Sequence, residues 1–149
     1  MKKILVIFYS RSGYTRTVAE NIVVECEADI EEIRDVKSRK GLYGYLRSVY
    51  EAIKMKPAEI EKTIKNPAEY NVVVLGGPVW AGKMASPIRT YITQNCDNAK
   101  AIGLFCTYGG SGAEKVLSDM EELCEKKAWS SQIINIPAAS GRGIFRANA

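Results

Sequence analysis

The chain has 149 residues, enough for one domain with a buried core. Hydrophobic residues make up 46% of it and charged residues 26%, a balance that excludes disordered and collagen-like chains. The net charge of +4 permits an acidic partner, and the absence of histidine excludes His-ligated metal sites and His-dependent catalytic triads.

Four apolar runs predict strands that are buried on both faces of a parallel sheet. The first, residues 4–9, is continuous rather than alternating, which is typical of such strands. Similar runs occupy residues 72–75, 101–106 and 133–136, with a weaker one at 30–33. Strands that alternate with helices predict an α/β fold with a doubly wound, five-stranded parallel sheet.

Helices are expected between these strands because apolar residues recur there at helical spacing. The expected helices cover residues 15–26, 42–53, 86–92 and 113–124. Ser86 is the predicted N-cap of the third, with Pro87 in its first position. In the second, the residues that we expect to face the core are Leu42, Tyr45, Leu46, Val49, Tyr50 and Ile53.

The whole chain, residues 1–149, is predicted to form a single domain without linkers or repeats. After the fifth strand, Gly141 and Gly143 argue against a packed C-terminal helix. The last helix of a doubly wound sheet shares a face with the first, so part of that face needs another cover. We expect a second copy of the chain, in a homodimer, to supply it.

The cysteines Cys26, Cys96, Cys106 and Cys124 are far apart and form no Cys-x-x-Cys pair. We therefore expect buried, reduced thiols and no metal site. The apolar run at residues 4–9 is too short for a signal peptide, and no stretch is long enough to span a bilayer. These features predict a cytoplasmic protein with no membrane contact.

The loop after the first strand is suited to binding a phosphate. It reads Ser10-Arg11-Ser12-Gly13-Tyr14-Thr15 and runs directly into a predicted helix. Hydroxyl groups, a glycine and the amides of a helix N-terminus together bind anions. No carboxylate occurs in residues 1–19 to oppose one. Alone, the loop is equally compatible with an ordinary serine-rich turn.

Two further glycine-rich loops carry aromatic residues at the ends of later strands. The predicted strand at residues 72–75 leads into Gly76-Gly77-Pro78-Val79-Trp80-Ala81-Gly82-Lys83. The predicted strand at residues 101–106 leads into Thr107-Tyr108-Gly109-Gly110-Ser111-Gly112. Ligands of open α/β sheets bind at this edge, where a planar ligand would cover an exposed indole. For Trp80 or Tyr108 taken singly, packing on the protein surface explains the aromatic ring equally well.

In order and spacing, the three loops resemble those of the flavodoxin family. The first matches that family's phosphate signature as Ser10-x-Ser12-Gly13-x-Thr15. The resemblance implies a flavodoxin-like fold with strand order 2-1-3-4-5, non-covalently bound FMN and electron transfer through the flavin. By position it implies that the cofactor contacts are Ser10, Arg11, Ser12, Gly13, Tyr14, Thr15, Pro78, Val79, Trp80, Ala81, Gly82, Thr107, Tyr108, Gly109 and Gly110.

A flavin would carry the chemistry itself, so no catalytic side chain is expected. Two alternatives stay open: an FMN-dependent NAD(P)H:quinone or small-acceptor oxidoreductase, and a flavin-free interaction domain. Whether the protein is an enzyme is therefore undecided, with an electron carrier favoured. The chain departs from typical flavodoxins in being net basic and in its predicted lack of a final helix.

Other functions of similar sheets lack their required residues. A phosphorylation receiver needs acidic residues where Tyr9-Ser10 and Gly76-Gly77 stand, and no cysteine has an arginine six residues on, as a small tyrosine phosphatase requires. A Rossmann site needs three glycines in the first loop, which has one. The basic, tyrosine-containing segment 37–56 is interpreted as a solvated helix face or a docking site for an acidic redox partner, not a nucleic-acid surface.

Overall fold

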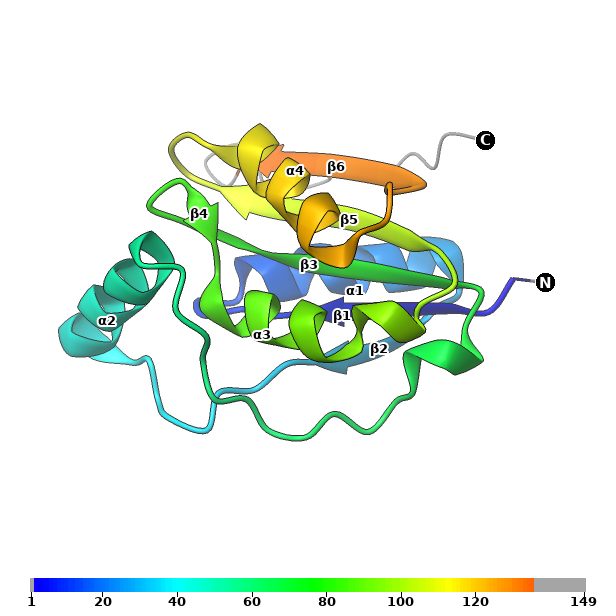
Figure 1. Cartoon of the computed structure of the whole chain (residues 1–149), viewed down its shortest axis with the longest axis horizontal. Coiled ribbons are helices and arrows are strands. Elements are labelled where there is room, and N and C mark those ends of the chain that lie inside the picture. The colour runs from blue at the N-terminus through cyan, green and yellow to red at the C-terminus, as the bar shows by residue number, and fades with distance from the viewer. Residues whose placement is uncertain (1, 136–149) are drawn as a thin grey trace.

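A central parallel sheet organises the molecule (Figure 1). The structure is a computed structural model and describes residues 2–135. The strands are β1 (Ile4–Phe8), β2 (Asp29–Glu32), β3 (Val72–Trp80), β5 (Ile102–Tyr108) and β6 (Ser130–Asn135), in the order β2-β1-β3-β5-β6. All four pairings along this order are parallel, which confirms the predicted fold class. The short β4 (Lys83–Met84) was not predicted and pairs antiparallel with the end of β3.

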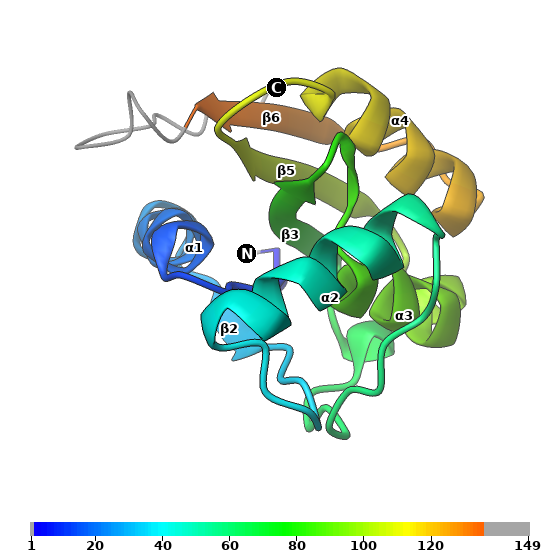
Figure 2. The same cartoon turned by 90° about the vertical axis from the view of Figure 1, so that its left-hand side faces the viewer.

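Helices cover both faces of the sheet (Figure 2). α1 (Tyr14–Cys26) packs on one face, and α3 (Ser86–Asn95) and α4 (Ala113–Cys124) pack on the other. α2 (Gly41–Ile53) lies beyond the carboxyl ends of the strands and contacts β3, β4 and α3. Two short 3₁₀ helices, η1 (Pro67–Glu69) and η2 (Cys96–Asn98), complete the described elements.

Alternate side chains of β1 divide the core into two layers. Val6 and Phe8 pack with α1, whereas Leu5, Ile7 and Tyr9 belong to the larger cluster under α3 and α4. The continuous apolar run in the sequence follows from this two-sided burial, because a strand covered on both faces has no solvent-facing side.

α2 contradicts the sequence-based expectation most strongly. Five of its six predicted inward residues are exposed, namely Leu42, Tyr45, Leu46, Tyr50 and Ile53. The buried positions are instead the small residues Gly44, Ser48 and Ala52. The reason is that α2 lies across the end of the sheet rather than on a face of it, so the main core does not take up its apolar side.

The prediction of buried, reduced cysteines is wrong for Cys96 and Cys124, and Cys26 is reduced but only partly buried. Cys96 and Cys124 form a disulfide with their Cα atoms 5.5 Å apart. It joins the ends of α3 and α4, which lie side by side on one face of the sheet. This proximity depends on helix packing, so the 28-residue separation along the chain did not reveal it. Cys26 and Cys106 are free thiols, and burial raises the pKa of Cys106 to about 12.

Smaller corrections concern element boundaries. Ala85 rather than Ser86 is the N-cap of α3, and the Ser86 hydroxyl is buried inside the first turn. The last strand begins at Ser130, three residues before the predicted start. The predicted absence of a C-terminal helix concerns residues 136–149, which lie outside the described part of the chain, and the homodimer expected from it stays a prediction.

Within residues 2–135, no helix is both long enough and apolar enough to cross a membrane. The same residues contain no cluster of cysteine and carboxylate side chains that could hold a metal ion.

Candidate functional site

A cavity of about 200 Å³ lies at the carboxyl ends of β1, β3 and β5. It joins nine of the predicted site residues with three from α2. The cavity is lined by Arg11, Ser12, Tyr14, Thr15, Tyr45, Ser48, Val49, Pro78, Val79, Trp80, Ala81 and Thr107. Residues nearly one hundred positions apart in sequence thus meet at one rim of the sheet, as ligand sites of open α/β sheets do.

The first loop presents the open N-terminus of α1 to this cavity. Gly13 is the N-cap, and its positive φ of 99° is a conformation that glycine adopts without strain. The Gly13 amide donates to the Ser10 hydroxyl over 3.0 Å, which fixes the turn. No side chain caps the helix and its first turn contains no acidic residue, so its amides remain suited to an anion.

Ser10 lines a different hollow from Ser12, Tyr14 and Thr15 of the same loop. Besides accepting from Gly13, it lines a neighbouring polar hollow of about 530 Å³ that also borders Arg34 and Lys40. Ser10 therefore shapes the first loop rather than lining the 200 Å³ cavity.

Trp80 forms an aromatic wall of the cavity and is held from behind. The Tyr9 ring meets it edge to face, with ring centroids 5.6 Å apart. The Arg39 guanidinium lies 5.1 Å from the centroid of the indole ring, within the range of a cation–π contact. Trp80 is partly buried by these contacts and still lines the cavity.

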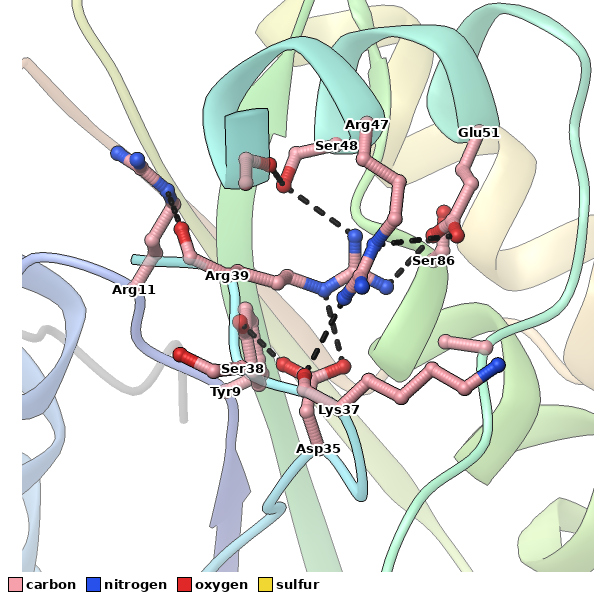
Figure 3. Close-up of polar contacts among 12 residues, drawn as sticks. Tyr9, Arg11, Asp35, Lys37, Ser38, Arg39, Arg47, Ser48, Glu51 and Ser86 are labelled. Carbon is pink, nitrogen blue, oxygen red and sulfur yellow. Dashed lines mark hydrogen bonds and ion pairs between the residues drawn. The ribbon is translucent and has the colours of Figure 1, made fainter. Parts of the chain in front are cut away.

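Arg39 is the centre of a buried polar cluster (Figure 3). Its side chain is 3% exposed and donates to Asp35 over 2.9 Å, to Glu51 over 2.6 Å and to the Ser48 hydroxyl over 3.2 Å. Burial lowers the pKa of Arg39, but the hydrogen bonds with Glu51 and Asp35 outweigh it and the pKa is raised. The guanidinium therefore stays charged and connects the segment before α2 to α2 itself.

Tyr9 joins the same cluster from β1's carboxyl end. Its hydroxyl donates to Asp35 over 2.6 Å. Burial, reinforced by the hydrogen bond with Asp35, raises the pKa of Tyr9 far above its ordinary value. The phenol therefore remains neutral throughout the range in which proteins function.

Of the third loop, residues 107–112, Thr107 lines the cavity. The Thr107 hydroxyl is buried and lies 2.8 Å from the Thr15 hydroxyl, which ties the first and third loops together. Tyr108, Gly109 and Gly110 do not line the cavity, and neither does Gly82. Tyr108 instead packs against the larger core cluster, and Gly109 and Gly110 lie at the exposed surface.

Three lining residues from α2 were missed by the sequence analysis. Tyr45, Ser48 and Val49 lie on adjacent faces of this helix. The sequence analysis predicted that Tyr45 and Val49 face the core. Arg39 was likewise missed, since a cation in a basic segment looks exposed. The sequence does contain one signal that α2 packs by its small residues: Gly44 and Ser48 lie on the side of the helix opposite the apolar stripe.

Among the described residues that line the cavity, Arg11 carries the only charge. It donates to the carbonyl groups of Arg39 and Gly41 over 3.1 and 3.2 Å, and its guanidinium lies 5.5 Å from the Tyr45 ring centroid. The site thus combines an anion-binding loop, one cation and aromatic walls, and its lining contains no carboxylate. This suits a ligand with a flat apolar part and an anionic tail.

Solved structures of other proteins share this fold. A flavoprotein from Lactobacillus acidophilus, solved in complex with FMN, superposes with a TM-score of 0.77 at 24% identity, over 89% of this chain and 93% of that one. The apo form of the flavoprotein from this organism gives 0.67 at 22% identity, over 94% and 97%. Two-electron reduced flavodoxin from Megasphaera elsdenii gives 0.56 at 20% identity, over 88% and 85%.

The family model described as flavodoxin matches residues 3–140, which is most of the sequence. The chain therefore belongs to the flavodoxin family.

Proposed function

We propose that this protein binds FMN in the cavity at the carboxyl ends of the strands and carries electrons between redox partners in the cytoplasm. The observation that carries the proposal is the convergence of an uncapped helix N-terminus and a tryptophan-walled cavity at one rim. Family membership and the FMN-bound structural neighbour support the same ligand.

The phosphate of the cofactor is assigned to the first loop. Ser12 and Thr15 offer hydroxyl groups, and the first amides of α1 point toward a bound anion. Arg11 adds a positive charge at the same edge, fixed by its two carbonyl contacts. Cation and helix terminus both favour an anionic tail.

The ring system is assigned to the pocket between Trp80, Pro78 and Tyr45. Because Arg39 and Tyr9 already hold the indole, little side-chain entropy is lost when a planar ligand stacks on it. The aromatic wall is therefore organised before the ligand arrives.

When bound, the flavin supplies the redox chemistry, and the chain contributes position, water exclusion and electrostatics. Reduction adds negative charge to the ring, which cations favour and carboxylates oppose. The cavity is lined by Arg11 and by no carboxylate, and the two charges of Asp35 and Glu51 are balanced by those of Arg39 and Arg47. We therefore expect a less negative potential for the fully reduced flavin than in a flavodoxin with an acidic site.

The experiment separates three functions with one preparation. Apo-protein is titrated with FMN, the loaded protein is reduced with dithionite, and oxidation of NADH and NADPH is measured with and without a quinone. An electron carrier binds FMN, accepts electrons from dithionite and oxidises either nucleotide slowly without a reductase. Rapid quinone-dependent oxidation of a nucleotide would make the protein an oxidoreductase, and failure to bind FMN would make it a flavin-free domain.

A further inference from the structure

α2 presents an apolar face to solvent that no described part of the chain covers. We define the α2 apolar face as Leu42, Tyr43, Leu46, Tyr50 and Ile53, all more than half exposed. Buried side chains of this size stabilise a protein, whereas a contiguous exposed set on a monomer marks an interaction site. The face runs the length of the helix, about 20 Å for 13 residues.

Contacts on the buried side of α2 fix the rotation of the helix about its axis, and this rotation leaves the apolar face exposed. Gly44 lies so close to the preceding segment that an added Cβ would sit 2.1 Å from the Arg39 backbone. Ser48 donates to the Gly44 carbonyl over 2.7 Å and accepts from Arg39, and Glu51 pairs with Arg39. Turning the apolar face inward would bury larger side chains there and break the Arg39 cluster.

Exposed lysines flank the α2 apolar face at both ends of the helix, and the nearest exposed carboxylate in sequence, Glu59, lies 4.0 Å from Lys37. Lys40 lies before the helix, and Lys54 and Lys56 follow it. Glu51 is the one carboxylate between residues 40 and 58, and its charge is held by Arg39. An apolar patch with a cationic rim is complementary to an apolar patch with an acidic rim.

The α2 apolar face is continuous with the cavity, because Tyr45 and Val49 of the same helix line the cavity. A partner seated on this face lies beside the site assigned to the flavin. Electron-transfer complexes are small, burying less than about 1,200 Å² in total, so one helix face provides a substantial part of such an interface.

We propose that the α2 apolar face is the docking surface for an acidic electron-transfer protein, an inference that rests on the proposed function. A second copy of the chain fits less well. Parallel or antiparallel pairing of two α2 helices brings the lysines at the helix ends against one another, and the carboxylate within the helix, Glu51, is already paired with Arg39 and Arg47. Tyrosines, which are enriched at protein interfaces, supply two of the five residues of the face.

The test uses an acidic plant-type [2Fe–2S] ferredoxin as the probe. The reduced ferredoxin is mixed with FMN-loaded protein in a stopped-flow instrument. In each productive encounter one electron leaves the iron–sulfur cluster and enters the flavin. We expect the second-order rate constant to fall with rising salt, and by about tenfold in Lys54→Glu/Lys56→Glu and in Leu46→Ser/Tyr50→Ser.

Matched variants elsewhere on the surface provide the controls. Lys62→Glu/Lys100→Glu changes two exposed lysines, and Val24→Ser/Ile64→Ser two exposed apolar residues, all outside α2. Both controls keep the wild-type rate constant. Equal rate constants in all variants overturn the docking proposal.

The docking proposal is also overturned if the α2 apolar face binds a membrane or a second copy of the chain. Binding to vesicles of anionic phosphatidylglycerol that the α2 variants abolish would assign the face to a membrane. A dimer in sedimentation velocity that the same variants dissociate would assign it to self-association. Calorimetric titration with oxidised ferredoxin measures docking without electron transfer, and FMN titration of each variant tests the proposed function separately.

Discussion

α2 and α3 are both amphipathic helices, yet they bury opposite kinds of residue. α3 rests on a face of the sheet and buries Ile88, Tyr91 and Ile92, as its pattern predicts. α2 crosses the end of the sheet and buries Gly44, Ser48 and Ala52, the first two against Arg39. A periodic pattern thus identifies the apolar side of a helix, but the neighbouring surface decides which side is buried.

The largest expected effect comes from removing the cation under α2. Arg39→Met leaves Asp35 and Glu51 without their buried partner, so we expect the free energy of unfolding to fall by about 4 kcal/mol. Urea unfolding of the apo-protein measures it. Arg34→Met, which alters a largely exposed arginine 3.8 Å from Glu32, is the control and should change stability by less than about 1 kcal/mol. Equal losses would mean that the Arg39 cluster does not hold α2.

The α3 and α4 layer has a covalent tie that α2 lacks. Chain-entropy arguments for the 28-residue separation predict that Cys124→Ser lowers the free energy of unfolding by about 3.5 kcal/mol. Cys26→Ser, at a free and half-buried thiol, serves as the control. A thiol assay on denatured, unreduced protein should count two thiols, Cys26 and Cys106, and four would contradict the disulfide.

A matched pair of truncations compares the two helices directly. Ile92→Ala opens a cavity in the core under α3, for which we expect a loss of about 3 kcal/mol. Leu46→Ala removes an exposed side chain of α2 and should change stability by less than about 0.5 kcal/mol. Comparable losses from the two changes would place the α2 apolar face inside the fold.

Alkaline pH gives a smaller effect at Tyr9. Unfolded tyrosine ionises near pH 10, whereas burial and Asp35 raise the pKa of folded Tyr9. The folded state then binds more protons, so stability from Tyr9 is complete below pH 10 and is lost as pH rises above it. Tyr9→Phe removes this contribution, and its stability deficit should shrink by about 1 kcal/mol between pH 10 and 11, unlike that of the exposed control Tyr43→Phe.

The sheet could be predicted because its strands are buried on both faces, which leaves continuous apolar runs such as residues 4–9. The phosphate loop and Trp80 could be placed because loops that follow parallel strands meet at one edge. The sequence could not predict the buried Arg39, the disulfide or the cavity-lining residues of α2, since each of them depends on how helices and strands pack together. Tyr108 and Gly109 were placed at the site by family resemblance; they do not line the cavity, and their contact with the cofactor stays a prediction.

The central claim, that the cavity beside Trp80 takes FMN, is tested most directly by the fluorescence of that residue. In Trp129→Phe, Trp80 is the sole tryptophan, and titration with FMN should quench its emission at a 1:1 endpoint. Trp80→Ala should weaken FMN binding by about 1 to 3 kcal/mol, measured by the flavin's own fluorescence. Emission that stays constant through saturating FMN, with unchanged affinity in Trp80→Ala, would contradict the account.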